Sequence, residues 1–160
     1  MELIRGTPAL SLLQSPKNSL PAVCTSLAKK KFSGYLALTI RANTGFEEGV
    51  LLYDSGKIVA CSYQYFLNTM TKTFEGKDAF QRLLNASAAK NGVLDAFELR
   101  KEDAHSILST SPQSVFTTPT TFSQPKEFSP LYYQQSIGNQ SQDSQENEGD
   151  KSFFKEEEEC

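Results

Sequence analysis

The sequence predicts an α+β domain, an antiparallel meander sheet of four to five strands with two main helices packed on it, followed by a disordered tail. Three observations predict this fold. Alternating or continuous apolar runs between Gly34 and Phe66 are joined by tight turns, which is typical of antiparallel strands. Segments with apolar residues three and four apart flank these runs, as helices that bury one face do. After Ser109 the chain is rich in Ser, Thr, Gln, Pro and Glu, which indicates disorder.

Charge is distributed unevenly along the 160 residues, whose net charge is −3. We expect residues 1–108 to form an interaction domain with slightly more basic than acidic groups, and residues 109–160 to form an acidic tail. Lys29–Lys31 is the only basic cluster. Nucleic acid is therefore not expected as a partner, because electrostatic binding of phosphates needs many clustered lysines and arginines.

Cysteine usage and hydropathy bear on the compartment. The chain has no long apolar stretch, and its first residues lack the apolar segment of a signal peptide. Its three cysteines, Cys24, Cys61 and Cys160, do not pair closely, which favours a reducing compartment. We therefore expect a cytoplasmic protein that does not associate with membranes.

The segment before Gly34 predicts an extended arm or short strand over residues 2–8, a loop over 9–18 and a helix over 20–31. Ser19 is placed to cap this helix, and Pro21 falls in its first turn, where a missing N–H is tolerated. Two interpretations of Lys29–Lys31 stay open. The lysines match the helix dipole as solvated side chains, or they form a docking site for an anion.

The central segment predicts three consecutive strands over residues 35–41, 49–53 and 57–65. Asp54 and Gly56 stand between the second and third of these, as in a type I turn closed by a glycine bulge. We expect a loop over 67–75, a helix over 78–90 with Gly92 as its left-handed cap, a meander-type strand over 93–99 and a short helix over 101–108. The residues expected to shape the turns are Gly34, Gly49, Asp54, Gly56 and Gly92.

No pattern in the chain places a nucleophile beside a base, collects metal ligands or forms a phosphate-binding glycine loop. The acidic pair Glu47 and Glu48 falls on a predicted turn, where it needs no catalytic explanation. Cys61 lies in an apolar strand, which predicts a buried structural thiol. His105, the single histidine, is expected to be an ordinary helix residue. We therefore expect no enzymatic activity, no catalytic residue, no metal and no cofactor.

Aromatic residues are the candidate interaction sites. Tyr63, Tyr65 and Phe66 predict a patch at the end of the third strand, which a partner chain, the 67–75 loop or a helix covers. The tail places apolar residues three apart, so that a polyproline II segment would align them on one edge; chance spacing in a biased sequence is the alternative. The tail residues in this pattern are Phe116, Pro119, Phe122, Pro125, Phe128 and Leu131.

The segments Phe32–Leu36 and Glu48–Ala60 and the helix from Ala79 to Gly92 resemble an archaeal family of uncharacterised proteins known as DUF2226. They are more distantly similar to the PATAN or DUF4388 domains of bacterial signalling proteins. The resemblance covers about residues 1–108 and rests on glycines and apolar positions. It implies a small interaction module in a cytosolic archaeal setting and implies nothing about catalysis.

The sequence therefore predicts a non-enzymatic protein-interaction or scaffold module in signalling or regulation. It would dock a protein partner, or a second copy as a homodimer, through a sheet edge or the aromatic patch. The alternative is a small-ligand or nucleotide-sensing domain with a pocket between the sheet and the helix that starts at Asp78. In that case Lys57, Lys72 or Arg82 would contact an anion.

Overall fold

The computed structural model describes residues 1–13, 16–42, 45–117 and 123–135. Residues 1–129 form one compact unit, and residues 130–135, which include a helical turn at 131–135, belong to a second. The elements of the first unit are β1 (Thr7–Leu13), α1 (Pro16–Lys29), β2 (Gly34–Ala42), β3 (Gly45–Asp54), β4 (Lys57–Leu67), β5 (Met70–Glu75), α2 (Gly76–Ala86), β6 (Gly92–Glu98), α3 (Lys101–Thr110) and the 3-10 helix η1 (Pro112–Ser114).

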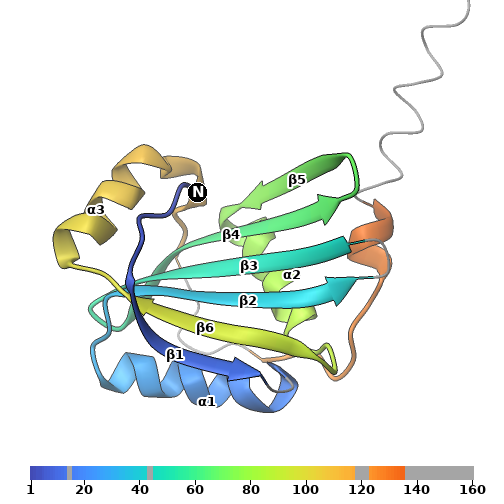
Figure 1. Cartoon of the computed structure of the whole chain (residues 1–160), viewed down its shortest axis with the longest axis horizontal. Coiled ribbons are helices and arrows are strands. Elements are labelled where there is room, and N and C mark those ends of the chain that lie inside the picture. Colours follow the sequence, from blue (N-terminus) through green and yellow to red (C-terminus); the bar gives the residue numbers. More distant parts are fainter. Residues whose placement is uncertain (14–15, 43–44, 118–122, 136–160) are drawn as a thin grey trace, which may run out of the picture. The chain divides into compact units, whose positions relative to one another are not determined.

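The strands form one antiparallel sheet in the order β1-β6-β2-β3-β4-β5 (Figure 1). Strands β2 to β5 follow one another as a meander. β6 returns beside β2, and β1 pairs with β6 at the far edge. The α+β class and the antiparallel sheet are confirmed, with six strands instead of four or five.

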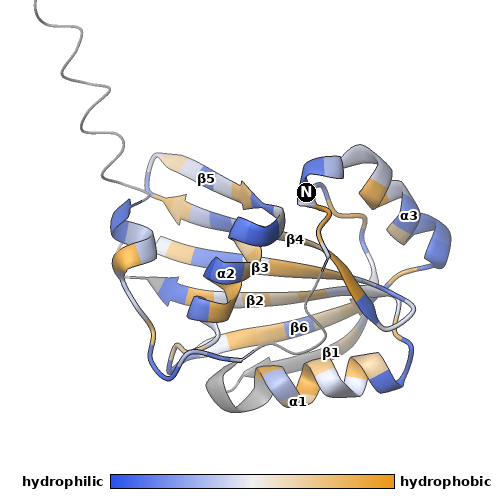
Figure 2. Ribbon diagram, turned by 180° about the vertical axis from the view of Figure 1, so that it is seen from behind, coloured by the Kyte–Doolittle hydropathy of each residue, from blue (hydrophilic) through white to orange (hydrophobic). Residues whose placement is uncertain are grey.

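Helices cover the two faces of the sheet unequally. The β3 residues Gly49 and Tyr53 share a face; Gly49 meets Leu83 of α2, and Tyr53 packs edge-on against Phe32 just after α1. Helices α1 and α2 therefore lie on one side, seen from behind in Figure 2. On the other side, Ile107 of α3 packs in a cluster with β2, β3 and β4 residues, and Met1 and Leu3 pack against the same cluster.

Two strands lie where loops were expected. Residues 67–75 hold β5, which pairs with β4 from Ser62 to Leu67, and residues 7–13 hold β1. The polar residues of β5 hid its strand character, because an edge strand with one solvated face carries few apolar side chains. The expected fourth meander strand is also wrong in its place, since β6 pairs with β2 and β1 and not with the preceding strand.

The helix ends differ from the predicted ones. α1 begins at Pro16, so that Pro21 lies inside the helix and Ser19 does not cap it. Proline at the first helical position is favourable because its missing N–H would have no partner there. α2 ends at Ala86 with Ser87 as its C-cap, four residues before the expected end at Lys90.

The domain continues beyond the expected boundary at residue 108. α3 runs to Thr110, η1 follows, and Val115 forms an antiparallel bridge with Ala60 of β4. The Asn85 side chain at the end of α2 exchanges two hydrogen bonds with the Ser129 backbone, at 2.8 and 2.9 Å. Order in the chain thus extends past Ser109, where disorder was expected to begin. The structure does not describe residues 118–122 and 136–160.

Candidate functional site

The β3–β4 turn consists of Ser55 and Gly56, whose φ angles are 52° and 85°. Two successive positive φ angles define a type I′ turn, whose twist matches that of the flanking strands. The expected type I turn with a glycine bulge is therefore wrong, and the register shift lies further along, where Leu52 and Tyr53 pair with β4. The Gly56 N–H donates to the Phe32 carbonyl at 2.7 Å, which ties the turn to the segment after α1.

Asp54 joins this turn to α3. Its carboxylate accepts a hydrogen bond from the Ser55 hydroxyl at 2.9 Å, and its Oδ2 lies 3.1 Å from His105 Nε2. These hydrogen bonds, that of His105 first, lower the pKa of Asp54. His105 is exposed on α3, as expected of an ordinary helix residue.

Close approach explains two of the predicted glycines. A Cβ on Gly49 would lie 2.7 Å from Leu83 Cδ1, and a Cβ on Gly34 would clash with the Phe97 carbonyl oxygen. Gly92 has a different place from the one predicted. It begins β6 opposite Ile40 and is not among the described glycines with a positive φ, so it is not the left-handed cap of α2.

The predicted aromatic patch is not a single surface. Tyr63 and Tyr65 are only 1% and 2% exposed, because both side chains lie on the face that α2 covers. Their rings pack edge-on, with 5.2 Å between centroids. Phe66 follows Tyr65 in the same strand and therefore points to the opposite face. The two tyrosines belong to the core and cannot contact a partner together with Phe66.

A polar cluster lies beneath α2. Glu47, expected on a surface turn, is only 3% exposed within β3 and accepts a 2.5 Å hydrogen bond from the Tyr63 hydroxyl. The Arg82 guanidinium stacks 3.6 Å from the centre of the Phe74 ring and donates to the Tyr65 hydroxyl at 3.4 Å. Burial raises the pKa of Glu47, while the Tyr63 hydrogen bond and the Arg82 charge oppose this rise.

The residues of the alternative ligand pocket do not converge. Arg82 also forms an ion pair with Asp78, with 3.5 Å between Nε and Oδ1, and the Lys72 ammonium lies 5.8 Å from the Phe74 ring centre. Lys57 lies opposite Asp54 in the register of β3 and β4, next to the turn that joins them and away from this cluster. The three cations therefore do not form a common anion site against α2.

The other face of the sheet carries exposed side chains at one end. α3 and the N-terminal residues cover the part around Leu52 and Ala60. None of the helices α1, α2 and α3 lies over the opposite end, which faces the viewer on the right of Figure 1. We call this region the open sheet face; it consists of Thr39 and Arg41 on β2, Phe46 and Glu48 on β3, Gln64 and Phe66 on β4, and Thr71 and Thr73 on β5.

Phe46 and Phe66 form a cross-strand pair at the centre of one row of the open sheet face. They are 56% and 38% exposed. Phe66 is a predicted interaction residue, whereas no role was predicted for Phe46. The position of Phe46 follows from its spacing in the sequence. Phe46, Glu48 and Val50 are two residues apart and therefore lie on one face of the strand that begins at Gly45.

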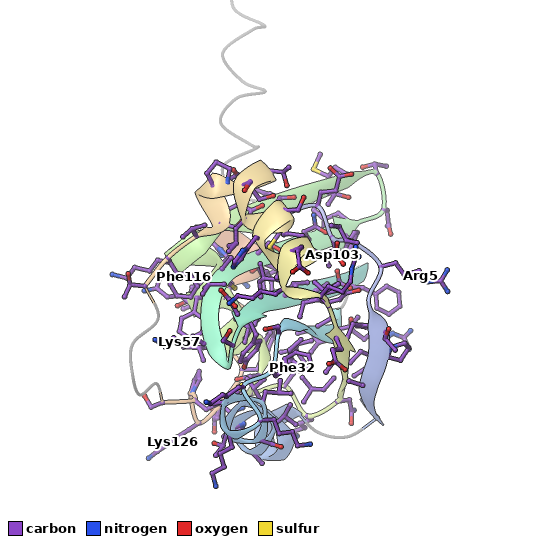
Figure 3. All side chains as sticks on the ribbon, turned by 90° about the vertical axis from the view of Figure 1, so that its left-hand side faces the viewer. Arg5, Phe32, Lys57, Asp103, Phe116 and Lys126 are labelled. Carbon is purple, nitrogen blue, oxygen red and sulfur yellow. The ribbon has the colours of Figure 1, made fainter. Side chains whose placement is uncertain are left out.

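A cavity of about 660 Å³ lies between α1 and the β1–β6 edge of the sheet, on the side of α1 and α2. Apolar side chains of α1 and β6 line it together with Phe32, and Figure 3 shows Phe32 between α1 and the sheet. Four charged residues complete the lining, Lys30, Lys31, Glu98 and Lys101. The lysine cluster at the end of α1 therefore faces, in part, a concave site.

The described tail aromatics lie in different surroundings. The Phe116 ring packs against Phe80 of α2, with 5.1 Å between centroids, and its N–H donates to the Val59 carbonyl. Phe128 is exposed. Phe122 lies outside the described residues. Phe116 therefore belongs to the domain and is not part of a free edge.

Groups with nucleophilic or metal-binding chemistry are dispersed in the described part of the chain. No three His, Cys, Asp or Glu residues gather there as a metal site would require. Cys24 and Cys61 are buried, and burial raises the pKa of the Cys61 thiol well above its ordinary value. No helix in the described ranges is long and apolar enough to cross a membrane.

A family model described as an uncharacterized protein conserved in archaea (DUF2226) matches residues 1–111. The match spans the strands β1 to β6 and the helices α1, α2 and α3. No curated protein and no solved structure matches the chain. The more distant similarity to PATAN and DUF4388 domains stays a prediction.

Proposed function

This chain belongs to the DUF2226 family of archaeal proteins, and we propose that it is a non-enzymatic interaction module that binds a second copy of itself through the open sheet face. The observation that carries the proposal is the exposed Phe46–Phe66 pair. Two large aromatic side chains at the centre of the open sheet face lose contact with water when another protein covers them, which favours association.

The open sheet face carries both a basic and an acidic side chain, which supports a second copy of the chain as the partner. Arg41 pairs with Phe46 in the sheet, and Glu48 lies one row away on the same face. A two-fold interface brings each patch against its own copy. The phenylalanines can then pack on phenylalanines, while Arg41 of one copy meets Glu48 of the other.

The alternative function, a ligand sensor with its pocket against α2, gains no support from the surroundings of α2. Arg82 is engaged with Asp78, Phe74 and Tyr65, and it is nearly buried. A concave site is present beside α1 instead.

The first experiment measures the mass of the full chain by light scattering behind size exclusion, across a concentration series. We expect a monomer–dimer equilibrium whose dissociation constant rises at least tenfold in the Phe46→Thr/Phe66→Thr variant, because burial of each ring contributes on the order of 1 kcal/mol or more. Threonine suits a strand, so circular dichroism should show an unchanged fold. The control is Ile4→Thr, which removes another exposed apolar side chain outside the open sheet face.

Two results would contradict the proposal. A wild-type chain that stays monomeric at the highest attainable concentration excludes self-association. A dimer that the double phenylalanine variant forms as tightly as wild type places the interface elsewhere, at a sheet edge for example.

A further inference from the structure

We propose that the cavity beside α1 binds a small molecule that joins an anionic group to an apolar body. This site is on the opposite side of the sheet from the open sheet face and is independent of self-association. Its volume of about 660 Å³ falls within the range of pockets that hold small ligands, roughly 300–1,000 Å³.

The inner lining of the cavity is apolar. Val23 and Leu27 contribute from α1, Ala96 contributes from β6, and Phe32 offers an aromatic ring. Such a lining takes up the hydrocarbon or ring part of a ligand, and polar groups at a few positions fix its orientation. Among the described lining residues, the charged groups are three lysines and one glutamate, so the cavity favours an anion.

Lys31 occupies a position that suits glycine better. Its N–H donates to the Ala28 carbonyl and the Phe32 N–H donates to the Leu27 carbonyl, each at 3.1 Å, which is the Schellman arrangement after a helix. Lys31 is the left-handed residue of this motif, with φ of 51°. A side chain in that conformation costs about 1–2 kcal/mol, a cost that glycine avoids. The lysine there places a third cation in the lining.

Lys101 is also unfavourable for its own helix. It is the first residue of α3, where the partial positive charge of the helix dipole repels a cation. Dipole matching explains Lys29 and Lys30 at the end of α1, but it explains neither Lys101 nor the backbone of Lys31. The charge of Lys101 also acts on Asp54, whose carboxylate is already bonded to His105 and Ser55. Binding of an anion in the cavity accounts for both lysines.

Phosphate and carboxylate groups share the chemistry that these lysines recognise. A mononucleotide supplies a phosphate on a flat base and sugar, and a fatty acid supplies a carboxylate on a hydrocarbon chain. Glu98 distinguishes the two, because it can accept hydrogen bonds from ribose hydroxyls and has no partner on an alkyl chain.

The test uses 1-anilinonaphthalene-8-sulfonate, an aromatic anion whose fluorescence rises in apolar sites, titrated into the folded full chain. We expect one saturable site. The Lys30→Ala/Lys101→Ala variant should raise the dissociation constant about tenfold, as loss of charged contacts does. Ala22→Trp should abolish binding, because Ala22 is exposed at the cavity lining and a large side chain there fills the space. Lys90→Ala, which removes an exposed lysine outside the lining, should bind as wild type does.

Lys31→Gly separates a ligand-binding lysine from a merely structural one. Glycine adopts the left-handed conformation without the strain that a side chain causes there, so the temperature at the midpoint of thermal unfolding should rise. Probe binding should weaken at the same time, because a cation is lost from the cavity lining. Unchanged probe affinity in Lys31→Gly and in the double lysine variant would overturn the proposal, as would probe binding that survives Ala22→Trp. Absence of a saturable site in the wild-type chain would overturn it as well.

Competition then identifies the source of the anion. Displacement of the probe by AMP, with loss of that displacement in Glu98→Gln, assigns a nucleotide. Displacement by dodecanoate that is the same in Glu98→Gln assigns an acyl ligand. Failure of both to displace the bound probe would overturn the ligand class.

Discussion

Glu47 is a carboxylic acid whose surroundings change its chemistry. It lies in a β-strand beneath α2 and keeps one strong hydrogen bond, from Tyr63. A carboxylate that loses its water on folding is harder to ionise, and neither the Tyr63 hydroxyl nor the Arg82 charge cancels this penalty. The folded state therefore holds the Glu47 proton to a higher pH than the unfolded chain does.

This difference predicts how stability depends on pH. Between the ordinary pKa of 4.5 and the raised folded value, the folded state binds more protons than the unfolded state, so the free energy of unfolding falls as pH rises. Glu47→Gln should remove the contribution of Glu47 to this fall. The variant should gain stability relative to wild type on going from pH 4 to pH 7, as urea unfolding at a series of pH values would measure.

Glu102→Gln is the control, because it removes a carboxylate from the exposed first turn of α3. Burial also raises the pKa of Glu48, so part of the slope should persist in Glu47→Gln. An identical pH dependence in wild type and Glu47→Gln would contradict the prediction.

Ser55 and Lys31 are non-glycine residues with positive φ, and only the first could be predicted from neighbouring residues. Ser55 precedes Gly56 between two apolar runs, a pairing that predicts a tight hairpin, and the sequence located this turn correctly. Lys31 gives no such signal, because its left-handed φ follows from where α1 ends. The sequence could show the lysines but not the cavity that three of them share.

At the scale of elements, Gly49 determines how closely α2 approaches the sheet. The side chain of Leu83 occupies the space that a Cβ on Gly49 would need. Leu83 is itself almost fully buried, so it cannot move aside freely.

Gly49→Ala should therefore destabilise the protein by about 1–3 kcal/mol through overpacking. Leu83→Ala alone should cost about 2–5 kcal/mol because it leaves a cavity. In the double variant the new methyl group occupies part of that cavity. The cost of Gly49→Ala should then shrink or vanish, as a double-mutant cycle of denaturant unfolding would show. Additive costs would mean that α2 and β3 do not meet at this point.

Elements with strong periodicity were predictable, and those without it were not. The strands from Gly34 to Leu67 follow the alternation of apolar residues, and α2 follows the helical spacing of Ala79, Phe80 and Leu83. β5 was missed because its stability comes from pairing with β4, a contact that its own residues do not reveal. Three covers were expected for Tyr63 and Tyr65: a helix, the 67–75 loop or a partner chain. In the structure the helix α2 covers them, a choice that alternation could not predict because it identifies two faces of a strand but not which face a helix covers.

At the scale of the whole molecule, the open sheet face makes a specific prediction about assembly. Arg41→Glu places acid opposite Glu48 of the second copy, and Glu48→Arg places base opposite Arg41. Each variant alone should dimerise at least tenfold more weakly than wild type, because like charges then face one another across the interface. An equimolar mixture of the two should restore association, since every contact between unlike copies again pairs opposite charges.

Light scattering on each variant and on the mixture, at pH 8 and low salt, measures this effect. Added salt should reduce the recovery, because it screens the charges. A mixture that associates no better than its separate components would show that Arg41 and Glu48 do not meet across a two-fold interface.

Local periodicity and turn residues were sufficient to predict the antiparallel α+β class, the central hairpins, the main helices and the family. Long-range packing in the folded protein accounts for the rest. It placed β6 between β1 and β2, buried Glu47 and the two tyrosines, exposed Phe46 and formed the cavity beside α1. These features depend on contacts between residues far apart in the chain. Such contacts arise only when the strands are ordered and the helices choose a face of the sheet.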